Sequence, residues 1–297
     1  MPDPQSLTLW GVDFSCAPST RKPITLAVGR LRGQEVELAD LERLTTLAGF
    51  ESLLQRPGRW LGAFDFPFGL PRAFVEDLDL GGDCAAVSAA VHRRCPARMD
   101  LRRLVDAWSA GRAPGQRLPH RRTDRSPGGV SSTSPLQTRY VPVGFMYFEG
   151  LSRLLAAGVE LPGLCPGDPA RRALEGYPAL LAHELIGARS YKNHAGDDRR
   201  FARQDLLAAA RQGRTRLGLR LKVRPALHRQ LLADIGGDLV DAALCLMQAA
   251  WAAGQPDCGR PAQVDGVEGW IVTAECPPPP PAPPPGRAPA RRPGFRR

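Results

Sequence analysis

The chain has 297 residues, 43% of them hydrophobic, and a formal net charge of +10. That length supports one large domain, or two small ones, with a substantial core. Since no run of eighteen apolar residues occurs, the sequence predicts no transmembrane helix. The N-terminus has neither the basic nor the apolar region of a secretory signal. We therefore expect a cytoplasmic protein without a membrane partner.

Half of the excess positive charge lies at the C-terminal end of the sequence. Residues 277–297 contain five arginines and no acid, which leaves a net charge of +5 for residues 1–276. The same end is rich in proline, a composition that favours extended polyproline II and cannot form a core. We expect a disordered tail over 277–297 and a moderately basic body. Such a body permits a polyanionic partner without requiring one.

The first part of the chain alternates strand-like and helical segments. Three segments rich in strand-forming residues predict a β-meander, namely 7–14, 23–31 and 35–38. Leucines at helical spacing then predict a helix over 40–55, with Asp40 as its N-cap. Residues 60–66 are almost wholly apolar, which is typical of a central parallel strand buried on both faces.

The remainder of the chain is mainly helical. We expect a helical and loop insertion at about 72–172, which includes a basic loop over 112–135. A short strand ending at Glu175 and a late edge strand over 269–275 complete the sheet, and further helices are predicted over 144–158, 199–212, 224–235 and 236–254. The sequence therefore predicts one α/β domain over 1–276. Its mixed central sheet would contain the meander and then parallel strands, flanked by helices.

Five carboxylates stand in unusual apolar settings. Asp13, Asp65 and Glu175 each come at the end of a predicted strand, and Asp238 and Asp241 open the apolar helix near the end of the chain. The last two are three residues apart and lie on one helix face. A buried carboxylate is costly unless it is paired, protonated or bound to a metal. Taken singly, each acid also has an ordinary structural role, such as a helix cap, a turn or a solvated edge.

One arrangement explains all of these acids together. If the strand ends and the helix start converge, they form a site for a divalent metal ion. The seven cysteines contain no CxxC pair and the five histidines do not cluster, so the ligands would be carboxylate oxygens. Such ligands favour Mg²⁺ or Mn²⁺. Two ions of this kind activate water and stabilise the leaving oxygen in phosphodiester cleavage.

This order of elements and acids resembles the ribonuclease H-like fold. Over residues 7 to 253 the sequence also resembles the DUF429 family of predicted ribonuclease H-like nucleases. Seven motifs carry the resemblance, in this order: GVDFSCAP, FDFPFGLP, RRTD (121–124), GFMYFEG, LEGYPALLA, SYKN (190–193) and GGDLVDAALCLMQAAW.

The resemblance implies roles for the five acids. Asp13, Asp65 and Asp241 match the presumed catalytic acids and would hold the metal. Asp238 matches a paired acid similar to that of Holliday-junction resolvases, and Glu175 matches a family glutamate, so both are candidate catalytic residues. Many nucleases of the superfamily carry a further glutamate on the first helix. Glu42 and Glu51 are available there, and no motif chooses between them.

Basic and aromatic residues near the motifs are candidates for substrate binding. Arg122, Arg139 and Lys192 are predicted to hold phosphate oxygens, with surface ion pairs as the alternative. Tyr140 and Tyr177 offer rings that stack on bases, although core packing explains them more simply.

These patterns favour a metal-dependent nuclease acting on RNA, DNA, or a branched or hybrid duplex. A non-catalytic binding or scaffold protein with the same fold is one alternative. A phosphotransferase or ATPase of the same core fold is another, but the segment FSCAPSTRKP after the first strand lacks the glycine of a phosphate-binding hairpin. The chain contains no P-loop, dinucleotide-binding or nucleophile-elbow motif.

Overall fold

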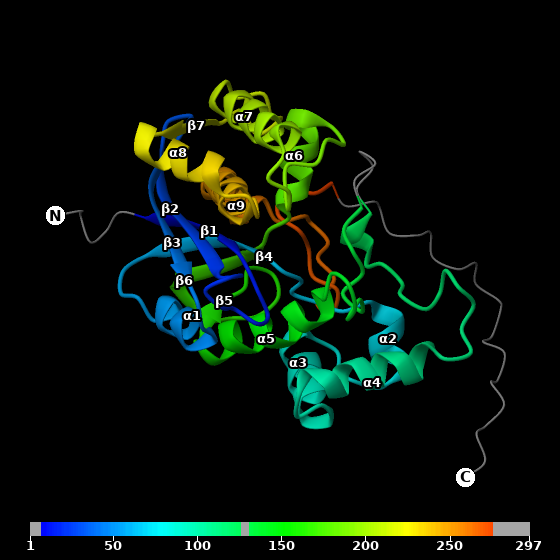
Figure 1. Ribbon diagram of the computed structural model, residues 1–297. Coiled ribbons are helices and arrows are strands. Elements are labelled where there is room, and N and C mark those ends of the chain that lie inside the picture. The colour runs from blue at the N-terminus through cyan, green and yellow to red at the C-terminus, as the bar shows by residue number, and fades with distance from the viewer. Residues whose placement is uncertain (1–6, 126–130, 276–297) are drawn as a thin grey trace, which may run out of the picture.

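The computed structural model describes residues 7–125 and 131–275. Within these residues one seven-stranded sheet has the order β5-β6-β4-β1-β2-β3-β7 (Figure 1). The strands are β1 (Thr8–Asp13), β2 (Ile24–Arg32), β3 (Glu35–Leu44), β4 (Trp60–Asp65), β5 (Val159–Glu160), β6 (Asp168–Glu175) and β7 (Arg220–Val223).

The sheet is mixed. β1, β2 and β3 form an antiparallel meander, and β4 pairs with β1 in parallel. β6 is parallel to β4, β5 is parallel to β6, and β7 is parallel to β3. The predicted α/β class, with a meander followed by parallel strands and flanking helices, is confirmed. The arrangement is consistent with a ribonuclease H-like core.

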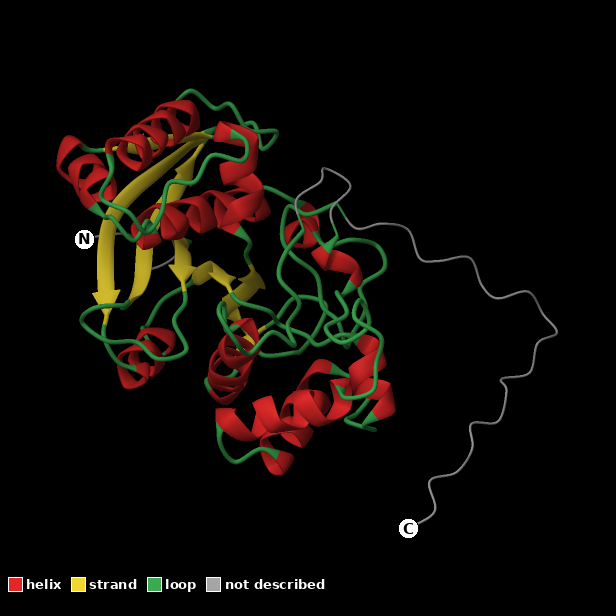
Figure 2. Cartoon of the chain, turned by 45° about the vertical axis from the view of Figure 1, so that its right-hand side comes forward, coloured by secondary structure: helices red, strands yellow, loops and turns green. Residues whose placement is uncertain are grey.

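Helices cover both faces of the sheet (Figures 1 and 2). On one side lie α1 (Leu47–Leu54), α2 (Arg72–Asp77), α3 (Cys84–Arg94), α4 (Arg98–Ser109) and α5 (Val143–Ala156). On the other side lie α6 (Pro178–Ile186), α7 (Asp197–Arg211), α8 (Pro225–Ala233) and α9 (Asp238–Ala253). Two short 3-10 helices are η1 (Arg122–Asp124) and η2 (Pro256–Gly259).

The alternation of side chains along the strands produces two separate cores. In β1, Leu9 contributes to the core beneath α6–α9, whereas Trp10 and Val12 contribute to the core beneath α1–α5. Because helices cover both faces, β1 and β4 are buried along nearly their whole length. Their continuous apolar sequence is the consequence of this double burial.

Gly11 allows α9 to cross β1 at unusually short range. A Cβ atom at position 11 would lie 2.0 Å from the carbonyl oxygen of Ala242 and 2.1 Å from the backbone nitrogen of Leu246. Both atoms belong to the backbone of α9, so a side chain there would displace the helix. The close approach also fixes how near the first turn of α9 lies to the end of β1.

Two predicted elements differ from the structure. The predicted helix over 40–55 is wrong in its first part, because β3 pairs with β2 as far as Leu44 and α1 begins only at Leu47. Thr46, rather than Asp40, is the N-cap, and its side chain accepts a hydrogen bond from the backbone of Gly49. The hydrogen bonds that β2 offers outweigh the helical spacing of the leucines.

The predicted edge strand over 269–275 is also wrong. Among the described residues, this segment meets β6 only through an isolated bridge between Ile271 and Glu175. β7 is a strand that the sequence did not indicate, since four residues show too little periodicity. Glu42 lies on β3 and pairs with Arg56, so it is not on the first helix.

The insertion predicted at about 72–172 contains α2–α5, β5 and the first residues of β6. The predicted tail over 277–297 lies outside the described residues. Among the residues that are described, no helix combines the length and apolarity needed to cross a membrane.

We predict that Gly11→Ala destabilises the protein by about 3 kcal/mol or more, the upper end of overpacking costs, because α9 must move away from β1. Urea unfolding measures the difference. Gly82→Ala is the matched control, since a Cβ at Gly82 meets no atom within 4 Å. Equal effects of the two substitutions would contradict the proposed role of Gly11.

Candidate metal centre

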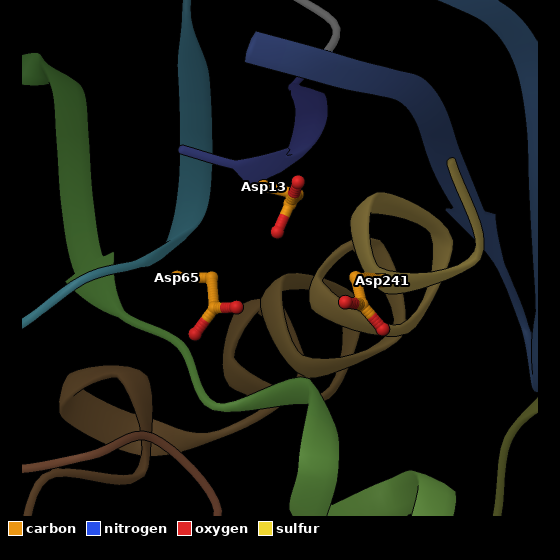
Figure 3. A group of neighbouring side chains, drawn as sticks. All are labelled: Asp13, Asp65 and Asp241. Carbon is orange, nitrogen blue, oxygen red and sulfur yellow. The ribbon is translucent and has the colours of Figure 1, made fainter. Parts of the chain in front are cut away.

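Three aspartates meet at one edge of the sheet. Asp13 and Asp65 are the last residues of β1 and β4 and are direct partners in the parallel register. Asp241 comes from the first turn of α9. Figure 3 shows the three carboxylates around one shared space, and one oxygen from each lies within 4.8 Å of the others. We call these three residues the acid triad.

The triad forms because parallel strands end at the same edge of a sheet, where α9 also begins. Gly237 precedes α9 in a left-handed conformation, with φ of 76°, which favours glycine. A Cβ there would lie 2.9 Å from Cγ of Lys192. The glycine therefore allows the segment that contains Lys192 to pack against the helix start. Acids in the first turn of α9 also interact favourably with the helix dipole.

Hydrogen-bond donors hold the acids of α9 in place. The hydroxyl of Tyr191 donates to Asp241 Oδ1 at 2.5 Å, and Nζ of Lys192 donates to Asp241 Oδ2. Nζ of Lys22 donates to Oδ1 of Asp238 at 2.5 Å. Asp238 lies beside the acid triad but is not one of the three acids whose oxygens converge.

A buried arginine holds the segment that carries Tyr191. Arg203 of α7 is 2% exposed. Its Nη1 donates to the backbone carbonyl of Tyr191 at 2.7 Å, and its Nε donates to that of Leu232 at 3.1 Å. Arg203 thereby links the Tyr191 segment to α8, so the donors to Asp241 have a fixed position.

The site carries excess negative charge. Its four aspartates face two lysines, so the fully ionised cluster has a net charge of about −2, the charge that one divalent cation balances. Burial raises the pKa of Asp13 to about 8, with contributions from Asp65 and Asp238 that Lys192 and Lys22 oppose. Burial also raises the pKa of Asp65 to about 6, against the effect of the same lysines.

The donor set fits a hard divalent ion. All three ligands are carboxylates, which suit Mg²⁺ or Mn²⁺ and not the softer metals. Ligands on opposite sides of a Mg²⁺ ion lie about 4 Å apart, since each bond is about 2.0–2.1 Å. Since the triad oxygens lie within 4.8 Å of one another, only a small closure would be needed for all three carboxylates to hold one ion.

Glu175 belongs to a different cluster. Both of its oxygens accept hydrogen bonds from Arg121, at 2.5 and 2.8 Å, and one also accepts from the backbone of Phe68 at 2.8 Å. Arg121 in turn donates to Asp124 at 2.8 Å. Arg121, Asp124 and Glu175, each no more than 4% exposed, form what we call the buried ion network. Glu175, a predicted catalytic residue, therefore pairs with Arg121 and is not one of the three converging acids.

The buried ion network is saturated with hydrogen bonds. Arg121 uses Nε, Nη1 and Nη2, with one further bond to the carbonyl of Glu268. Burial by itself lowers the pKa of Arg121, but the two carboxylates raise it above its usual value. Ser132 donates to Asp124 at 2.6 Å. This network joins the end of β6 to η1 and to the segment around Glu268.

The three predicted basic residues lie in different places. Lys192 is at the acid triad. Arg122 lines another pocket, together with Trp108 and His120, that contains none of the triad. Arg139 forms an exposed bidentate pair with Asp106, at 2.7 and 2.8 Å. The structure therefore brings one of the three to the candidate metal centre.

The two tyrosines also differ. Tyr140 is 99% exposed, so the interpretation of its ring as core packing is wrong. Tyr177 is half-buried and lines a pocket beside Asp65. Burial raises the pKa of Tyr177 to about 12, and the charges of Asp65 and Asp124 contribute.

Sequence reasoning missed several residues of the site. Lys22 is 216 positions from its partner Asp238, and no motif connects them. Arg203 lies in an ordinary amphipathic helix. Tyr191 stands in the SYKN motif and Arg121 in the RRTD motif, so a closer use of these motifs would have included both.

No family model, curated protein or solved structure matches this chain.

We predict that Asp13→Asn stabilises the metal-free protein, and more so at pH 8 than at pH 5. Asp13 has a folded-state pKa of about 8, above the ordinary value near 4 in the unfolded chain. The folded state therefore binds more protons between these values, and wild-type stability falls as pH rises through this window. Asparagine removes the cost, by a few kcal/mol at pH 8.

Urea unfolding in EDTA at both pH values measures this effect. Asp205→Asn, at an exposed acid paired with Arg189, is the control. A stability difference for Asp13→Asn that does not change with pH would show that the carboxyl is not buried as described.

We predict that Arg121→Met destabilises the protein by about 3–5 kcal/mol, because it leaves two buried carboxylates without their partner. Arg139→Met breaks an exposed pair and should cost about 0–1 kcal/mol. Chemical denaturation of both variants gives the comparison. Similar small losses would mean that the buried ion network does not hold these segments together.

Proposed function

We propose that this protein is a metal-dependent nuclease that hydrolyses phosphodiester bonds of nucleic acid. The observation that carries the proposal is the convergence of Asp13, Asp65 and Asp241 within 4.8 Å. When all four aspartates are ionised, the cluster has an unbalanced charge of about −2, which favours a divalent cation, with Mg²⁺ or Mn²⁺ best suited to the donors. When bound, such an ion supplies Lewis-acid activation of water and stabilises charge on the phosphate.

The residues of the chain have distinct parts in this proposal. The acid triad holds the metal. Tyr191 fixes the orientation of Asp241 through its hydroxyl, as residues around a metal ligand commonly do. Lys192 is 34% exposed at its side chain, so its ammonium group is able to turn from Asp241 to a phosphate oxygen. Lys22 neutralises Asp238 and keeps that carboxylate from repelling the substrate.

The alternatives have less support. A phosphotransferase of the same fold needs a glycine-containing hairpin after the first strand, and residues 14–23 contain no glycine. A purely structural protein would have no need for four neighbouring aspartates with only two lysines to balance them when ionised. The positive net charge of +10 suits a nucleic-acid partner. Phosphate contacts by Arg122 and Arg139, DUF429 membership and a cytoplasmic location stay predictions.

We predict Mg²⁺- or Mn²⁺-dependent cleavage of nucleic acid that is lost in Asp13→Asn, Asp65→Asn and Asp241→Asn. Each loss should exceed the roughly 10–100-fold reduction typical of removing a residue that only supports a metal ligand. Tyr191→Phe should fall within that smaller range. A gel assay on single-stranded, duplex, hybrid and branched substrates measures activity, and calorimetry with Mn²⁺ measures metal binding.

Asp205→Asn is the matched control, because Asp205 is 56% exposed and pairs with Arg189 and is not one of the triad. It should leave cleavage and Mn²⁺ binding unchanged. Intact substrates across the whole panel, in the presence of either metal, would contradict the nuclease proposal. Tight ATP binding together with such inactivity would favour the phosphotransferase.

A further inference from the structure

A pocket opens directly beside the acid triad. It has a volume of about 140 Å³ and shares Asp65 with the candidate metal centre. We call it the side pocket. The lining residues that matter here are Asp65, Thr133, Val141, Val143, Met146 and Tyr177. A group bound in this pocket would therefore be adjacent to a phosphate held at the triad.

The charged residues that line the side pocket do not attract anions. These residues include Arg121 and Glu175, but every donor nitrogen of Arg121 already bonds to a carboxylate or to the carbonyl of Glu268. The buried ion network contains one arginine and two acids, so its charge is negative overall. A phosphate is disfavoured here, and a neutral group fits better.

The walls are suited to a flat ring. Val143 and Met146 of α5 give apolar contacts, and Tyr177 adds an aromatic side chain. Tyr177 is held at its backbone and at its hydroxyl. Its backbone nitrogen donates to Oε1 of Gln248 at 3.0 Å, and its hydroxyl donates to the carbonyl of Ser131 at 3.1 Å. Thr133 is exposed at the rim and offers a hydroxyl to a polar edge.

A second aromatic residue lies next in the chain to the pocket lining. Tyr140 is 99% exposed, in a left-handed backbone conformation with φ of 51°, and directly precedes Val141 of the pocket lining. Non-glycine residues adopt this conformation at a cost, which is most common at functional sites. An exposed ring next in the chain to a lining residue is a candidate stacking surface for a base.

We propose that the side pocket binds one unpaired nucleobase of the nucleotide next to the scissile phosphate. The preferred substrate is then a single strand, or a nucleotide turned out of a duplex, because a paired base is not available to enter. This inference rests on the proposed nuclease function. It assigns the negatively charged phosphate to the metal and lysine side, and the neutral base to the pocket.

The test uses labelled single-stranded oligonucleotides in which each nucleotide in turn is abasic. Affinity is measured by fluorescence anisotropy with Ca²⁺, and cleavage is measured separately with Mg²⁺ or Mn²⁺. We expect one abasic position, fixed relative to the cleaved bond, to weaken binding about 5- to 150-fold, the range for loss of one stacked base. Abasic nucleotides at distant positions should change binding little.

Protein variants then locate the base. Tyr177→Leu should weaken binding of the intact strand but not of the strand with the critical abasic position, whereas Tyr177→Phe keeps the ring and should bind like wild type. Met146→Trp narrows the pocket and should act like Tyr177→Leu. Met99→Trp is the matched control, because Met99 is exposed on α4 and is not part of the pocket lining.

The outcomes separate the two proposals. Metal-dependent cleavage that is insensitive to abasic positions, or that prefers intact duplex, overturns the base pocket and leaves the nuclease function standing. Absence of both binding and cleavage for every oligonucleotide overturns both. A position-specific abasic effect that Tyr177→Leu abolishes supports the pocket as the base site.

Discussion

The burial of carboxylates at one sheet edge is the constraint on which the rest of this structure depends. Asp13 and Asp65 end neighbouring parallel strands, and Asp241 begins the helix that crosses them. Removing three acids from water is unfavourable unless positive charge accompanies them. Several contacts keep these acids together. They are the close packing of α9 on Gly11, the segment that Arg203 holds, and the hydrogen bonds from the two lysines.

Two buried electrostatic clusters lie side by side and differ in kind. In the buried ion network, Arg121 directs all its donors to fixed acceptors, and the carboxylates receive further bonds from the backbone and Ser132. That cluster is complete within the protein and holds segments together. The acid triad has fewer cationic partners than acids, which is why we propose that it binds a cation. This difference, more than burial itself, is the reason for assigning the proposed function to the acid triad and a structural role to the buried ion network.

The side pocket lies between these two clusters, sharing Asp65 with the acid triad and Arg121 and Glu175 with the buried ion network. Its saturated polar groups and apolar walls favour a neutral ring, whereas the triad is where we propose that a metal and a phosphate bind. A nucleotide contains both kinds of group at adjacent positions. The proposed site therefore divides the recognition of one nucleotide between two neighbouring environments of opposite character.

The sequence by itself determined the strands that end in Asp13 and Asp65, the apolar helix that begins with Asp238 and Asp241, and the α/β class. These features follow from local periodicity and from the cost of placing acids in apolar runs. It did not reveal that β3 extends to Leu44, because the partner strand decides that pairing. Only the tertiary structure separated Glu175 from the candidate metal centre and brought Lys22 to Asp238. Contacts between residues far apart in the chain depend on how the elements pack in three dimensions, which local pattern does not encode.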